Sequence, residues 1–144
     1  MIRAFVLCLG LLTACTQQQQ PFLPSVSVGS GGSIWGGSAT TYFADDTVVV
    51  RSWGGTPDSL KEERFVLPQG TFAALQKVAL LQLDSIVVPD ETQACLDYGS
   101  DFIAVSLSEN EVSRVDVSCP YPPVTAGRNA IRTAASNPGF AHEL

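Results

Sequence analysis

The side chains with the clearest chemical potential lie in one acidic segment. Asp97, Tyr98 and Asp101 belong to the sequence DYGSD, which begins two residues after Cys95. Such carboxylates suit a cation site or a pair of acids flanking a glycosidic bond. The D-x-[DN]-x-[DN]-G spacing of a calcium loop is absent, and only the presence of acids supports a glycosidase pair. We interpret the segment first as a solvated loop, and keep Asp97, Tyr98 and Asp101, with Trp53, as candidate contacts for a ligand or partner.

No other part of the sequence carries a recognisable catalytic pattern. The single histidine, His142, is third from the end of the sequence, where chain termini fray. The G-x-S-x-G, H-E-x-x-H and S-x-x-K patterns of common hydrolases do not occur. We therefore expect no catalytic residue, no metal site and no cofactor.

The first residues have the composition of an export signal. Arg3 provides a positive start, and residues 4–12 form an apolar run far shorter than the roughly 17 residues that span a bilayer. The run ends in the letters LTAC, which resemble the lipobox of bacterial lipoproteins. That resemblance implies a signal peptide over 1–14, diacylglycerol on the Cys15 thiol and acylation of the new amino terminus. An ordinary cleaved signal peptide, with Cys15 as a bystander, is the alternative.

The lipoprotein interpretation also predicts a location and a class of partner. Thr16 stands where an aspartate retains lipoproteins of enteric bacteria at the inner membrane, so the family rule indicates the periplasmic face of the outer membrane. Residues 15–144 contain seven basic and fourteen acidic side chains. That balance offers no electrostatic basis for binding nucleic acid. We expect the membrane, through the lipid on Cys15, and an envelope protein as partners.

Two cysteines remain for a disulfide bond. Cys8 leaves with the signal peptide and Cys15 carries lipid, so Cys95 and Cys119 are the pair available in an oxidising compartment. A reactive or zinc-binding pair is the alternative, but no C-x-x-C spacing and no nearby histidine supports it. We predict a structural disulfide between Cys95 and Cys119.

The composition changes near residue 39 and divides the chain. Residues 15–38 are rich in Gln, Ser, Gly and Pro, which predicts a flexible tether behind the lipidated cysteine. Residues 39–144 then form one small domain. Its first part contains β-branched and aromatic runs around Asp45-Asp46, which predict a hairpin, and a short strand at 64–67. The spacing of the apolar residues after Thr71, the predicted N-cap, indicates a helix.

A second hairpin and helix complete the predicted domain. Apolar residues alternate over 103–107 and over 115–119, with a turn near Glu109-Asn110. The prolines at 120–123 end the second strand, and Thr125 is placed to cap a helix that runs to about Ser136. We predict an α+β fold in which two β-hairpins form a small, mainly antiparallel sheet packed with two helices in the order ββαββα.

This order resembles emfourin-type inhibitors of thermolysin-like metalloproteases over roughly residues 30–136. The resemblance follows Gly36-Gly37, the F-x-x-L of the first helix and Asp101-Phe102 of the second hairpin. It implies an inhibitory function, although the cysteine pair and the lipid anchor depart from the pattern. The leading hypothesis is a membrane-anchored periplasmic lipoprotein whose small domain binds or supports an envelope protein. A small periplasmic hydrolase that uses the loop carboxylates is the alternative.

Overall fold

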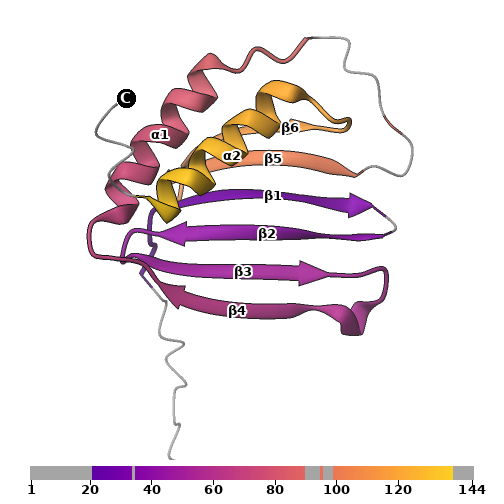
Figure 1. Ribbon diagram of the computed structural model, residues 1–144, viewed down its shortest axis with the longest axis horizontal. Helices are drawn as coiled ribbons and strands as arrows, with labels where there is room; N and C mark the ends of the chain where they lie inside the picture. The colour runs from indigo at the N-terminus through magenta and orange to yellow at the C-terminus, as the bar shows by residue number, and fades with distance from the viewer. Residues whose placement is uncertain (1–20, 34, 90–94, 96–98, 138–144) are drawn as a thin grey trace, which may run out of the picture.

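The computed structural model describes residues 21–33, 35–89, 95 and 99–137. These residues form a β-sheet, two α-helices and a short 3-10 helix, η1 (Figure 1). In chain order the elements are β1 (Ser25–Ser33), β2 (Gly36–Phe43), β3 (Thr47–Trp53), η1 (Pro57–Ser59), β4 (Lys61–Val66), α1 (Thr71–Ser85), β5 (Ser100–Ser108), β6 (Glu111–Val117) and α2 (Pro122–Ser136).

The strands form one antiparallel sheet in the order β4-β3-β2-β1-β5-β6 (Figure 1). β1 is a central strand: Val26 lies opposite Tyr42 of β2 on one side and opposite Val105 of β5 on the other. It therefore joins the hairpin β5-β6 to the three strands β2, β3 and β4. The predicted α+β class and the mainly antiparallel sheet are confirmed.

The prediction of a tether over 15–38 is wrong from Ser25 onward, because Ser25–Ser33 is the central strand β1. The order is accordingly ββββαββα, with four strands before the first helix, whereas the sequence had suggested a hairpin and one short strand at 64–67. Val26 and Val28 of β1 are fully buried. Their two-residue spacing is the ordinary pattern of a strand with one buried face.

The glycines of β1 explain why its composition resembled a linker. A Cβ atom added at Gly29 would lie 2.9 Å from Cε1 of Phe102, and one added at Gly31 would collide with the Trp53 ring. Aromatic rings from β5 and β3 therefore occupy the space above these residues. Glycine weakens an isolated strand, but here it permits close packing of rings from neighbouring strands.

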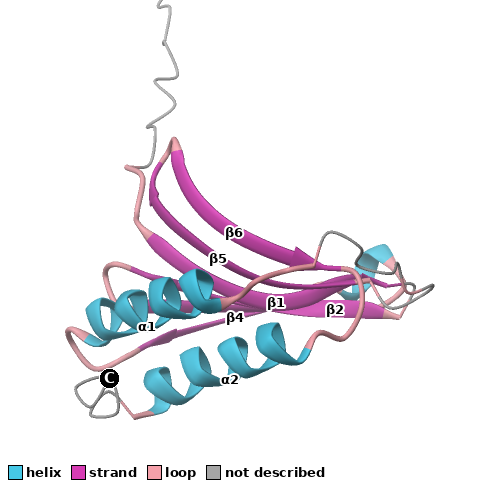
Figure 2. Ribbon diagram, turned by 90° about the horizontal axis from the view of Figure 1, so that it is seen from above, coloured by secondary structure: helices cyan, strands magenta, loops and turns pink. Residues whose placement is uncertain are grey.

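Both helices lie side by side on one face of the sheet, which we call the covered face (Figure 2). Their apolar residues pack against β1, β5 and β6. The opposite, uncovered face carries no helix in the described part of the chain. The fully buried core side chains include Val26, Val28, Leu75, Val78, Ile103, Val105, Val124 and Ile131.

α1 begins differently from the prediction. Its N-cap is Gly70, which has a positive φ of 85°, and Thr71 is the first helical residue. The Thr71 hydroxyl donates to the Pro68 carbonyl over 2.6 Å. The cap is supplied by Asp46 in the β2-β3 turn, whose carboxylate accepts from the backbone N–H groups of Gly70 and Phe72, each over 2.7 Å. This carboxylate satisfies donors that a helix start leaves unpaired.

α2 also begins earlier than predicted. It starts at Pro122, and Thr125 lies inside its first turn instead of capping it. Proline is suited to the first helical position, because its missing N–H would have no helical acceptor there. The Tyr121 hydroxyl donates to the Val87 carbonyl over 2.7 Å and ties this helix start to the segment after α1.

Candidate functional site

The residues singled out from the sequence are only partly placed by the structure. Cys15, Asp97 and Tyr98 lie outside the described residues. Trp53 is the last residue of β3 and is half-buried. Its ring lies where a Cβ on Gly31 or Gly37 would be, so the ring packs on the uncovered face of the sheet. Trp53 therefore packs on the sheet surface over Gly31 and Gly37, which have no side chains to exclude its ring.

Asp101 is a buried member of an ion pair. Its side chain is 4% exposed, and one of its carboxylate oxygens lies 2.5 Å from a guanidinium nitrogen of Arg128, whose side chain is 11% exposed. The pair connects the beginning of β5 to α2. A buried charge is costly without a partner, so this contact holds both side chains in place. Asp101 is thus positioned as a structural residue at the sheet–helix junction.

The predicted disulfide is present between Cys95 and Cys119, whose Cα atoms are 5.1 Å apart. Cys119 does not end the second strand, as its alternation had suggested, because β6 ends at Val117. It lies in the bend between β6 and α2. The disulfide therefore joins the segment before β5 to the segment before α2.

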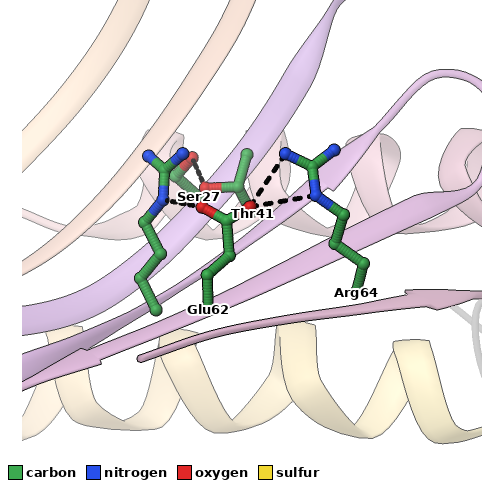
Figure 3. A network of polar contacts seen from close by, with 5 residues as sticks. Ser27, Thr41, Glu62 and Arg64 are labelled. Carbon is green, nitrogen blue, oxygen red and sulfur yellow. Dashed lines mark hydrogen bonds and ion pairs between the residues drawn. The ribbon is translucent and has the colours of Figure 1, made fainter. Parts of the chain in front are cut away.

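The uncovered face carries a polar network on its outer strands (Figure 3). The Glu62 carboxylate of β4 accepts from Nε of Arg51 over 2.8 Å and from Nε of Arg64 over 2.9 Å. These two arginines lower the pKa of Glu62, chiefly by hydrogen bonding. On the central strands, the hydroxyls of Ser27 and Thr41 are 3.0 Å apart and hydrogen-bonded. A solvated face of this kind is common in antiparallel sheets.

The covered face contains a groove at its other margin. Both helices lie toward the β1-β5-β6 side of the sheet (Figure 1), and a hollow of about 440 Å³ lies between α2 and the strands β2, β3 and β4. We call it the α2–β4 groove. Most of its lining is apolar, and the side chains that define it are Tyr42, Val48, Val50, Phe65, Leu67 and Arg132.

The groove combines an accessible apolar surface with one cationic side chain. Phe65 of β4 is 50% exposed there, whereas Val48 at its base is nearly buried. Arg132 projects from α2 and makes no ion pair with any residue in the described ranges. Burial raises the pKa of Tyr42, and the charge of Arg132 acts in the opposite direction. Arg132 is therefore close enough to influence the buried phenol at the groove base.

Two other hollows differ from the groove in their charges. One, of about 620 Å³, lies between α1 and β6, and its arginine, Arg114, pairs with Asp116. The other, of about 470 Å³, lies on the uncovered face, and its arginines are the two that pair with Glu62. In the α2–β4 groove, by contrast, Arg132 has no ion-pair partner among the described residues.

Sequence reasoning did not identify the groove. Its apolar residues alternate correctly along β3, and Phe65 follows the same pattern on β4, but these signals predict burial beneath a helix. Nothing local shows that the two helices stop short of these strands. The position of Arg132 one residue after the fully buried Ile131 was the only local indication of a charge at the edge of a core.

Comparisons with other proteins add no family assignment. The chain matches no family model, and no curated protein is significantly similar to it. Within the described ranges, no group of three or more histidine, cysteine or acidic side chains is arranged to hold a metal ion. No helix in the same ranges has the length and apolar character needed to span a membrane.

Proposed function

We propose that this protein is a lipid-anchored binding protein of the bacterial cell envelope, held at the periplasmic face of the outer membrane. The observation that carries the anchor is the LTAC sequence ending at Cys15, directly after an apolar run of export-signal length. More than one acyl chain is needed for durable attachment, and the mature lipoprotein amino terminus supplies them.

The position of β1 brings the domain close to the proposed anchor. Only six positions along the chain lead from Cys15 to Pro21, the first residue that the structure describes. Fully extended, they span at most about 20 Å. The Pro24 carbonyl then accepts from the backbone N–H of Ala44 over 2.9 Å, so the chain enters the sheet beside the β2-β3 turn. The domain would therefore lie near the membrane surface, and the α2–β4 groove would be presented to partners there.

The contacts of the candidate residues favour binding over hydrolysis. Asp101 is engaged with Arg128, and Trp53 packs on the sheet, so neither is arranged as a free reactive group. The α2–β4 groove instead offers apolar surface and a charge for recognition. Inhibition of a thermolysin-like metalloprotease, suggested by the emfourin-like order of elements, would be one form of such binding. Residual thermolysin activity after addition of the purified protein tests that form directly.

The anchor is tested by Cys15→Ala, with Cys8→Ala as the matched control because Cys8 lies within the proposed signal peptide. We expect Cys15→Ala to move the protein out of the membrane fraction and Cys8→Ala to leave it there. Intact mass of the extracted wild-type protein should begin at Cys15 and include acyl groups. Membrane retention of the Cys15→Ala protein, or an unacylated wild-type mass, would contradict the proposal.

A further inference from the structure

We infer that the α2–β4 groove binds one amphipathic helix of an envelope protein, with an acidic side chain beside the apolar stripe of that helix. This inference rests on the proposed binding function and specifies its partner. The groove supplies both elements of recognition, because Phe65 and Val50 offer apolar surface and Arg132 offers a positive charge on the opposite wall.

The dimensions of the two layers favour a helix as the occupant. Each strand adds about 4.8 Å to the width of a sheet, whereas a packed helix covers about 10 Å. Six strands therefore make a sheet about 29 Å wide, whereas two packed helices span about 20 Å, and here they pack on β1, β5 and β6. The difference of about 9 Å is close to the width of one more helix, which would lie beside α2 in the α2–β4 groove.

The chemistry of the groove indicates which helix would fit. A helix binds in such a groove through apolar residues spaced at i, i+3, i+4 and i+7. Its side toward α2 would face Arg132, which has no carboxylate partner among the described residues. An acidic residue on that side would supply the missing charge, whereas a lysine there would be repelled.

Addition of a partner strand to β4 is the competing mode of binding. Among the strands that the structure describes, β4 lies at the sheet edge and pairs with β3 alone. Its sequence begins with four consecutive charged residues, Lys61 to Arg64. Charges of this kind protect edge strands against pairing with another chain. The helix-binding groove is thus better suited to a partner than the strand edge beside it.

A pair of designed peptides tests the inference. The first is a fluorescein-labelled helix of 18 residues with leucines at i, i+3, i+4 and i+7 and glutamates along one border of that stripe. The second carries lysines in place of the glutamates. Binding to the full chain in zwitterionic lipid nanodiscs is measured by fluorescence anisotropy, with empty nanodiscs as the blank. We expect the glutamate peptide to bind about three- to tenfold more tightly.

Matched variants locate the binding surface. Arg132→Glu should reverse the preference between the two peptides, whereas Lys77→Glu, the same change on exposed α1 surface, should leave the preference unchanged. Phe65→Ser should weaken both peptides by about tenfold, because it removes half-exposed apolar surface from the groove. Val66→Ser alters the next residue on the other face of β4 and should have no effect.

Three results would overturn the inference. The first is equal binding of the two peptides, and the second is an unchanged peptide preference in Arg132→Glu. The third is peptide binding that occurs only after removal of residues 138–144, because that result would show that this segment of the chain occupies the groove. A failure of the anchor is seen separately by fractionation of Cys15→Ala. If the wild-type chain proves soluble, the peptide measurement is made on the soluble protein, so the two proposals can fail independently.

Discussion

Removal of the Cys95–Cys119 disulfide should lower the free energy of unfolding by a calculable amount. The two cysteines are 24 positions apart, so the bond closes a loop of about 25 residues in the unfolded chain. The chain-entropy model gives about 3.5 kcal/mol for a loop of this length. In this model the bond stabilises the protein by restricting the unfolded ensemble.

The corresponding change in melting temperature follows from the size of the domain. Unfolding entropy is about 2.1 cal/mol/K per residue, or about 0.24 kcal/mol/K for some 115 residues. A loss of about 3.5 kcal/mol should therefore lower Tm by about 15 °C. The double variant Cys95→Ser/Cys119→Ser is preferable to either single variant, because it leaves no free thiol to form other disulfides.

The assay is thermal and urea unfolding followed by circular dichroism, with the wild-type protein measured in the presence and absence of reductant. Ser118→Ala, an exposed change beside Cys119, is the control and should leave Tm unchanged. The reasoning fails if the double variant melts within about 3 °C of the oxidised wild type. It also fails if both wild-type thiols react with a labelling reagent under native, non-reducing conditions.

Three further changes test other parts of the fold by urea unfolding. Asp101→Asn should cost about 3–5 kcal/mol by leaving the Arg128 charge buried without its partner, and a loss below 1 kcal/mol would contradict a structural ion pair. Glu62→Gln should destabilise the protein at pH 7. Because folding lowers the pKa of Glu62, the wild-type protein should be more stable than Glu62→Gln above the unfolded-state pKa of Glu62. This difference in stability should disappear as the pH falls through the folded-state pKa. A difference that persists at strongly acidic pH would show that it does not come from the Glu62 charge. Gly29→Ala should cost about 1–3 kcal/mol because its Cβ would lie 2.5 Å from the Ser38 carbonyl oxygen, and unchanged stability would show that β2 can move away.

Local patterns predicted the elements whose signals lie within their own residues. The apolar face of α1, including Phe72, Leu75 and Val78, is buried as its helical spacing indicated. The turn at Asp45-Asp46 and the alternation along β5 and β6 were likewise readable from sequence. These features depend on periodicity and turn chemistry, both of which act over a few residues.

Features that depend on distant residues were missed or misassigned. β1 resembled a tether because its glycines carry no side chains, and the Trp53 and Phe102 rings that cover them come from other strands. The cap of α1 was assigned to Thr71, whereas Asp46 provides it from 24 residues before Gly70. In each case the stabilising partner is far away in the chain.

The sequence by itself predicted the α+β class and the main apolar faces, because these follow from local periodicity. It also predicted the pairing of Cys95 with Cys119, on the premise that Cys8 and Cys15 belong to the export signal and the lipid anchor. It also carries the whole basis for the proposed anchor at Cys15. Only the tertiary structure decided that β1 joins the strands into one sheet and that the two helices pack on β1, β5 and β6, leaving the α2–β4 groove beside them. The width of a sheet relative to its helices is a property of the assembled layers, so no single segment encodes the α2–β4 groove.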